Sequence, residues 1–158
     1  GWFRRAGMRN VMLDTHQYLI AMEDQLFSGP ARRLYLRSRR LPWLYRMLVG
    51  ASGIAIRSAA RRIPVLVGEW CVENQWALHS QNRSAAYRQV SRLQRAAWDV
   101  SAGQIYWSYQ LARSAKPGSG EGKPPRDPRN GGNLEAWDLT RVWRHGWIRV
   151  DISHDDVP

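Results

Sequence analysis

The stretch RRIPVLVGEWCVENQW, residues 61–76, joins a run of branched apolar residues directly to a carboxylate. Residues 64–67 are short, β-branched and carry proline only at the first position, which predicts a buried strand. Gly68 then removes a side chain, and Glu69 stands where the strand should end. An ionisable group at the end of a buried strand costs free energy unless it is paired or used in chemistry. Glu69 is therefore the first candidate for a functional residue.

The composition is that of a folded globular protein. The chain has 158 residues, of which 44% are apolar and 23% charged, enough for one domain with its own core. No apolar run approaches the roughly 18 residues of a membrane-spanning helix. The single cysteine, Cys71, excludes an internal disulfide framework. The first residues lack a signal-peptide pattern and a starting Met, which is compatible with a mature form or a fragment and leaves the compartment open.

The net charge of +11 is strongly basic, as in many nucleic-acid-binding proteins. All the basic residues except Lys116 and Lys123 are arginine, a bias that the base composition of the coding DNA explains equally well. They are spread along the chain, with one dense stretch at 32–62, which we expect to form the solvated outer face of helices. A basic nucleic-acid-binding α/β domain therefore stays as a minor alternative.

Strand-like and helix-like patterns alternate along the chain. Pro42 and the glycines of 50–53 are expected to divide residues 31–62 into at least two helical pieces. Asn82 or Ser84 can cap the clearest helix. In chain order, we predict a buried strand at 11–13, the helical pieces of 31–62, the strand at 64–67, a helix over 82–103, a strand at 104–110, a loop at 113–133 and a short helix at 134–147. This alternation favours an α/β fold with a parallel sheet.

Polar and aromatic side chains follow the three predicted strands. They are His16 and Tyr18, Glu69 and Trp70, and Trp107 and Tyr109. The carboxyl ends of parallel strands form the active-site face of a (β/α) barrel or an open α/β sheet. No glycine-rich phosphate loop follows a strand, and the histidines and the cysteine lack zinc-type spacing, so we expect no metal site.

Three segments together resemble glycoside hydrolase family 5, most of all its exo-β-1,3-glucanase-like and cellulase-like members. VMLDTHQY (11–18), PVLVGEW (64–70) and IYWSYQ (105–110) are similar to the sixth, seventh and eighth strands of that family. WDLTRVWRHGWI (137–148) is similar to the end of its catalytic domain, so the likeness runs from about residue 2 to residue 148. The resemblance implies a (β/α)₈ barrel and a retaining β-glycosidase that acts on a β-linked oligo- or polysaccharide without a cofactor.

The resemblance also implies roles for individual residues. Glu69 matches the nucleophile, and Tyr18 the tyrosine that hydrogen-bonds this carboxylate and helps to keep it ionised and oriented. His16 would contact a sugar hydroxyl or a neighbouring side chain. Trp107 matches the tryptophan that forms a platform under the sugar, because an aromatic face stacks on the C–H face of a pyranose. Trp70 is expected to line a further subsite, as are Trp76 and Tyr109.

One part of the family pattern is missing. The acid/base of the family is a glutamate that follows an asparagine at the end of the fourth strand, and no Asn-Glu pair occurs here. No segment resembles strands one to five, and a complete barrel needs about 250 residues. We therefore predict that 1–158 is a partial catalytic domain, strands six to eight with their helices, whose partner is the missing N-terminal half of the same barrel. The isolated chain should then be nearly inactive.

Simpler roles are expected for several other residues. Glu23, Asp24 and Glu73 are predicted to be solvated at the surface, and Asp14 to be a structural hydrogen-bonding group. Cys71 is expected to be a buried, inert thiol. Most of the tryptophans, Trp43, Trp98, Trp137, Trp143 and Trp147, are expected to pack in the core or between helices.

The main alternative to an enzyme is a non-catalytic carbohydrate-binding or degenerate relative of the family. The sequence predicts no nucleic-acid partner and no membrane partner. It leaves open the sugar, the linkage, exo or endo action and the oligomeric state.

Overall fold

The computed structural model describes residues 10–26, 41–111 and 134–149. A parallel sheet of three strands, in the order β1-β2-β3, lies at the centre of this part. The strands are β1 (Leu13–Gln17), β2 (Val65–Trp70) and β3 (Gly103–Tyr106). The helices are α2 (Leu19–Leu26), α4 (Leu41–Ala60), α5 (Gln75–His79), α6 (Arg83–Trp98), the 3₁₀ turn η1 (Leu134–Trp137) and α7 (Leu139–Arg144). The predicted loop at 113–133 and the stretch 31–40 lie outside the described residues.

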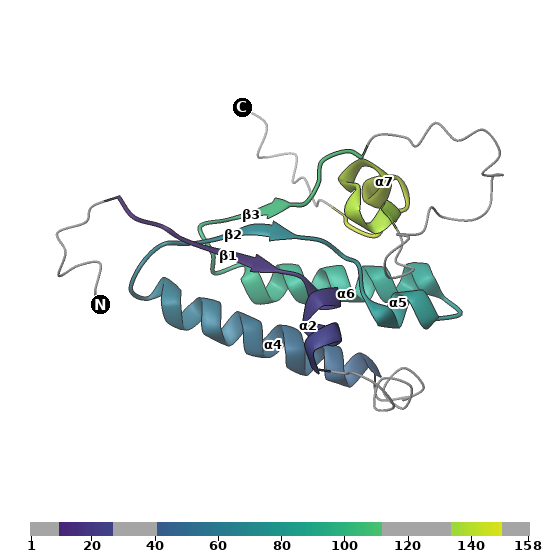
Figure 1. Ribbon diagram of the computed structural model, residues 1–158, viewed down its shortest axis with the longest axis horizontal. Coiled ribbons are helices and arrows are strands. Elements are labelled where there is room, and N and C mark those ends of the chain that lie inside the picture. Colours follow the sequence, from purple (N-terminus) through teal and green to yellow (C-terminus); the bar gives the residue numbers. More distant parts are fainter. Residues whose placement is uncertain (1–9, 27–40, 112–133, 150–158) are drawn as a thin grey trace.

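Helices cover one face of this sheet. Figure 1 shows α4 and α6 side by side below the strands and α7 beyond their carboxyl ends. The core between the layers is formed by Val65 and Val67 of β2 with Ile56 of α4 and Trp98 of α6. None of the described helices packs on the other face. Parallel sheets are normally covered on both faces, so the described part has the layering of half an α/β structure.

The first strand differs from the prediction. A buried strand was expected at 11–13, but β1 begins at Leu13 and carries its polar residues within the strand. Met12 and Leu13 are exposed, Leu13 by 40%, because β1 is an edge strand with one uncovered face. The prediction of a buried strand was wrong for this reason, although the strand itself is present.

Helix α4 is continuous through the glycines that were expected to break it. Pro42 is its second residue, where the missing N–H has no partner within the helix in any case. A Cβ on Gly53 would lie 2.8 Å from the carbonyl oxygen and 2.9 Å from the Cβ of Ala97 in α6. At Gly53 the backbones of α4 and α6 therefore come close together, and the lack of a side chain allows this packing.

Two glycines of α4 give a matched stability test. We expect Gly53→Ala to lower the free energy of unfolding by about 1–3 kcal/mol, because its methyl group overlaps Ala97. Gly50 has no atom within 4 Å of the position of its Cβ, so Gly50→Ala should raise stability by about 0.5–1 kcal/mol through helix propensity. Urea unfolding measures both. Equal effects of the two substitutions would contradict the close crossing of the helices.

Helix α6 begins and ends for local reasons. The Asn82 side chain accepts a hydrogen bond from the Ala85 N–H at 3.0 Å, so Asn82 is the cap, and Ser84 instead accepts from the indole N–H of Trp147. The helix ends at Trp98, earlier than predicted, and Gly103 opens β3. Among the described helices, none has both the length and the apolar character needed to cross a bilayer.

Candidate active site

A β-bulge at Gly68 determines which way Glu69 points. Val65 and Val67 face the helices, and strict alternation would send residue 69 to the same side. In the pairing with β1, however, Thr15 lies opposite Val67 and the next residue, His16, lies opposite Glu69, so Gly68 is passed over. In the pairing with β3, Gln104 lies opposite Val67 and Tyr106 opposite Trp70, so three steps along β2 match two along β3. Strand β2 thus has one extra residue relative to both neighbours. Bulges re-aim side chains in this way, and here Glu69 turns away from the core.

Asp14 holds the bulge from the neighbouring strand. Its Oδ1 accepts a hydrogen bond from the Gly68 N–H at 3.1 Å. A Cβ on Gly68 would lie 2.1 Å from the same oxygen, so a side chain fits at this position only if the Asp14 carboxylate moves away. Asp14 is therefore a structural hydrogen-bonding group, as the sequence suggested, and it favours glycine at residue 68.

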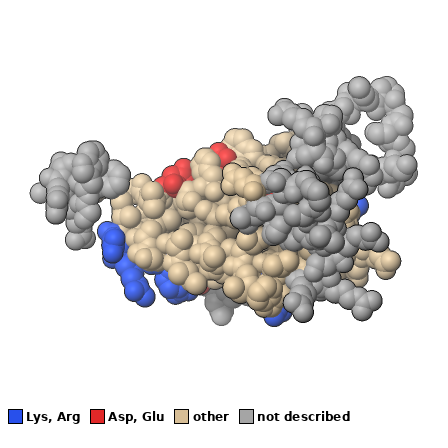
Figure 2. All heavy atoms as spheres, turned by 60° about the horizontal axis from the view of Figure 1, so that its bottom comes forward, with Lys and Arg blue, Asp and Glu red and all other residues tan. Residues whose placement is uncertain are grey.

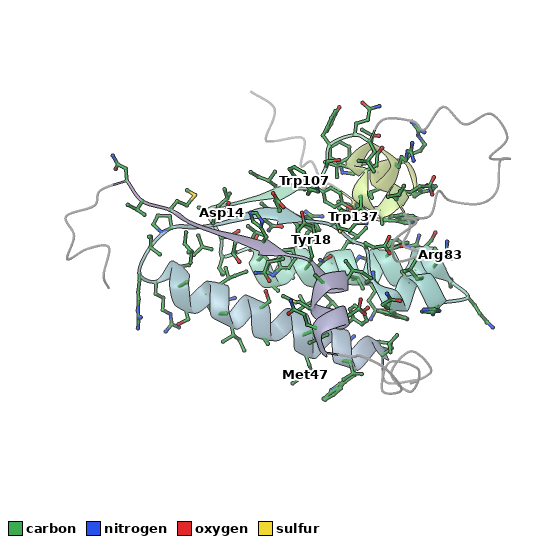
Figure 3. All side chains as sticks on the ribbon, in the orientation of Figure 1. Asp14, Tyr18, Met47, Arg83, Trp107 and Trp137 are labelled. Carbon is green, nitrogen blue, oxygen red and sulfur yellow. The ribbon has the colours of Figure 1, made fainter. Side chains whose placement is uncertain are left out.

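The Glu69 carboxylate is held by two side chains of the chain segment that contains β1. The Tyr18 hydroxyl donates to Oε2 at 2.7 Å, and His16 Nδ1 lies 3.3 Å from the same oxygen. His16 Nε2 in turn lies 3.3 Å from Asp14 Oδ2. The four residues form a chain from Asp14, near the start of β1, through His16 and Glu69 to Tyr18 at the carboxyl end of the sheet, and Figure 3 labels Asp14 and Tyr18 at its two ends.

The environment of Tyr18 keeps this donor protonated. Partial burial, together with the hydrogen bond to Glu69 and its negative charge, raises the pKa of Tyr18 well above its usual value. A hydroxyl with a raised pKa remains a hydrogen-bond donor at neutral and mildly alkaline pH. The Glu69 side chain is 27% exposed, so it is fixed on one side and open to a ligand on the other.

Aromatic residues lie at the same end of the sheet as Tyr18. The Trp137 ring stacks on Tyr18 with centroids 5.2 Å apart and planes 28° apart. Trp107 and Tyr109, after β3, are exposed. The Ser108 N–H donates to the Trp137 carbonyl at 2.6 Å, which ties the end of β3 to η1, and the Trp107–Ser108 peptide bond is cis. Figure 3 shows Trp107 and Trp137 at the same end of the sheet as Tyr18.

The structure brings together most of the predicted site residues and adds one. His16, Tyr18 and Glu69 are in contact, and Trp107 lies at the same end of the sheet. Trp137 was expected only to pack in the core, yet it stacks on Tyr18. In the sequence, the only sign of a site role for Trp137 was its place at the start of the family-like segment 137–148. The role itself is shown by the contact of its ring with Tyr18.

Trp70 is placed elsewhere. The ring is only 4% exposed and makes edge contacts with Trp98 and Tyr106 at centroid distances of 5.4 and 5.0 Å. The bulge that turns Glu69 outward turns Trp70 into the core, so its predicted place beside a ligand is corrected to a packing role. Trp76 likewise packs against Tyr45, with centroids 5.7 Å apart.

Two acidic residues predicted at the surface are buried. Glu23 and Glu73 are 2% and 1% exposed. Glu23 Oε2 accepts from the Gln75 N–H at 3.0 Å, and Glu73 Oε1 accepts from the Tyr87 hydroxyl at 3.1 Å. These two hydrogen bonds tie α2 to the start of α5, and the segment between β2 and α5 to α6. The side chain of Asp24 lies outside the described residues.

Cys71 is fully buried, as predicted, and burial raises the pKa of its thiol well above the usual value. The folded protein should therefore resist iodoacetamide at neutral pH and react once urea unfolds it. The pKa of Cys71 is higher in the folded than in the unfolded protein, so the protonated thiol favours the folded state. This contribution to stability is complete below about pH 8.5 and is lost as the pH rises toward the folded pKa. Urea unfolding across this range should show a smaller alkaline loss for Cys71→Ala than for the wild type. Rapid labelling of the native protein would contradict the burial.

Among the described residues, no group of His, Cys, Asp and Glu is arranged to hold a metal ion. No protein-family model and no curated protein matches this chain.

Proposed function

We propose that this chain is the C-terminal part of the (β/α)₈ catalytic domain of a retaining β-glycosidase, with Glu69 as its nucleophile. The observation that carries the proposal is the Glu69 carboxylate, which the bulge turns outward at the carboxyl end of the central strand and which Tyr18 holds at 2.7 Å. Barrel enzymes take their catalytic side chains from this end of their strands. The resemblance of the three strand segments to glycoside hydrolase family 5 supports the same assignment.

In a retaining mechanism the carboxylate of Glu69 attacks the anomeric carbon and forms a glycosyl ester. A second carboxyl group protonates the leaving oxygen and then activates the water that hydrolyses this ester. Within the described residues, both side-chain contacts of Glu69, from Tyr18 and His16, go to Oε2. Oε1 is then the oxygen presented to the sugar, while Tyr18 fixes the plane of the carboxylate.

The second carboxyl group is proposed to come from the rest of the barrel. A retaining enzyme needs it about 5–5.5 Å from the nucleophile. Asp14 does not suit this role, because its Oδ1 accepts from Gly68 and its Oδ2 lies against His16. The remaining strands of a barrel would be added at the outer edges of β1 and β3, and the uncovered face of the sheet would then face the barrel interior.

The substrate proposed is a β-linked oligo- or polysaccharide, and no cofactor is required. Trp107 and Tyr109 offer exposed rings next to the Glu69 cluster, and such rings stack on the apolar face of a pyranose. Trp137 would support this surface through Tyr18.

Covalent trapping tests the proposal. The coding region upstream of Gly1 is sequenced, and the longest open frame is expressed whole. It is then treated with an activated 2-deoxy-2-fluoro-β-glycoside, which forms a slowly hydrolysed glycosyl ester. We expect the sugar on the peptide that contains Glu69, and no label in Glu69→Gln. A label on another residue, or an upstream stop codon together with no turnover, would refute the assignment.

A non-catalytic carbohydrate-binding relative is the second candidate. The exposed rings of Trp107 and Tyr109, and the lack of an Asn-Glu pair in the sequence, favour it. It predicts that the whole protein binds β-glucan without hydrolysis. Trp107→Ala should then weaken binding, whereas Glu69→Gln should leave it unchanged.

A further inference from the structure

Helices α4 and α6 carry only positive charge. The sequence has no acidic residue between Asp24 and Glu69, nor between Glu73 and Asp99, so α4 and α6 contain arginines but no Asp or Glu. Figure 2 shows arginines mainly along the lower rim of the visible face and acidic residues at the upper rim. The described carboxylates of Asp14 and Glu69 belong to the strands instead. Charge is thus segregated between the two layers.

Helix α4 also exposes three large apolar side chains. Trp43, Met47 and Ile54 are 57%, 55% and 71% exposed, and we call them the α4 ridge. Their spacing of four and seven residues places them along one face of the helix. At 100° per residue this face is roughly opposite the one that buries Tyr45 and Val49. Figure 3 shows Met47 on the side of α4 away from the sheet.

Arginines flank the ridge. Arg46, one turn from Trp43 and Gly50, lines a groove of about 470 Å³ between α4 and α6 together with Arg88 and Arg92. Arg57 continues the exposed positive charge along α4. Within the described part of the chain, no carboxylate forms an ion pair with any of these arginines. Their charge is therefore available to an anionic partner.

We propose that this surface adsorbs to an anionic phospholipid membrane. The α4 ridge would enter the boundary between headgroups and acyl chains, and the flanking arginines would contact the lipid phosphates. Amphipathic helices that lie on membranes combine apolar side chains that include Trp with basic residues and few acidic ones. None of the described helices could span a membrane, and adsorption does not require one.

The apolar ridge favours a membrane over a nucleic acid. Nucleic acids are bound largely through phosphate contacts at polar interfaces, which would leave Met47 and Ile54 without apolar partners. A bilayer can bind both the apolar side chains of the α4 ridge and the arginines beside it. The ridge also faces away from the sheet, so adding strands at the edges of β1 and β3 would not cover it. The inference is therefore independent of the role of Glu69.

Vesicle flotation with the full chain tests this surface. We expect flotation with vesicles of phosphatidylcholine and phosphatidylglycerol, no flotation with phosphatidylcholine alone, and weaker binding as salt is raised. Arg46→Gln and Arg57→Gln should each weaken binding roughly fivefold. The triple variant W43S/M47S/I54S should weaken it by at least about tenfold.

Matched substitutions on α7 and just after it provide the control. Trp143 is also exposed, and so are Arg144 and Arg149, so Trp143→Ser and the pair R144Q/R149Q should bind as the wild type does. Circular dichroism shows whether each variant is folded. If the triple variant is not, the single arginine variants still test the proposal. Equal binding to neutral vesicles, or arginine variants that bind as tightly as the wild type, would overturn the proposal. So would binding to RNA without binding to vesicles.

Discussion

Glu69→Gln in the complete enzyme is expected to lower kcat by roughly four to six orders of magnitude, because an amide cannot form the glycosyl ester. The glutamine oxygen can still accept the Tyr18 hydrogen bond that Oε2 accepts at 2.7 Å. The variant should therefore fold with unchanged stability and bind substrate. Steady-state kinetics with an aryl β-glycoside and urea unfolding measure the two properties separately.

Chemical rescue provides the control for this loss. In Glu69→Gly, added azide can occupy the space of the carboxylate and attack the anomeric carbon itself. The product should be the α-glycosyl azide, the opposite configuration to the β-glycoside substrate, because only one displacement then occurs. Activity of Glu69→Gln within tenfold of the wild type would show that another residue is the nucleophile.

Gly68→Ala is the second substitution with a large expected effect. The new Cβ would lie 2.1 Å from Asp14 Oδ1, so the carboxylate must move and its 3.1 Å hydrogen bond to the residue 68 N–H must break. We expect a loss of about 1–3 kcal/mol in the free energy of unfolding, mainly from the broken bond, because the half-exposed Asp14 side chain can move aside. Urea unfolding monitored by fluorescence measures it.

A double-mutant cycle identifies the cause. Asp14→Ala alone should cost about 1 kcal/mol, because it removes the acceptor of the Gly68 N–H. Once the carboxylate is gone, Gly68→Ala should cost much less than in the wild type, which leaves a coupling of about 1–3 kcal/mol. Additive losses would mean that Asp14 and residue 68 do not meet as described.

The existence of each strand was predictable, whereas the bounds of β1 and β3 and the bulge in β2 were not. Val65 and Val67 identify β2 through local preference for strand, and that signal lies within the segment. An extra residue is defined only by the pairing of β2 with β1 and β3, which depends on residues about 50 and 36 positions away. The glycine at 68 was visible in the sequence, but not its consequence for Glu69 and Trp70.

Burial of polar and apolar side chains was the least predictable property. Glu23 and Glu73 were expected in water because of their residue type, yet distant groups on Gln75 and Tyr87 satisfy them inside the protein. Trp43 was expected between helices and is exposed. The sequence shows the period of a helix, but the face that meets the sheet is selected by the packing of the whole domain.

Within the described residues, the arginines of α4 and α6 lie on one side of the sheet, and the carboxylates of Asp14 and Glu69 lie on the strands, so positive and negative charge are set apart. In the field of a negatively charged surface such a molecule rotates before it makes contact, with α4 and α6 leading. Asp14 and Glu69 then trail on the far side and face the solution. A polymer arriving from that solution would meet the Glu69 end first, so orientation and access would both follow from where the arginines lie.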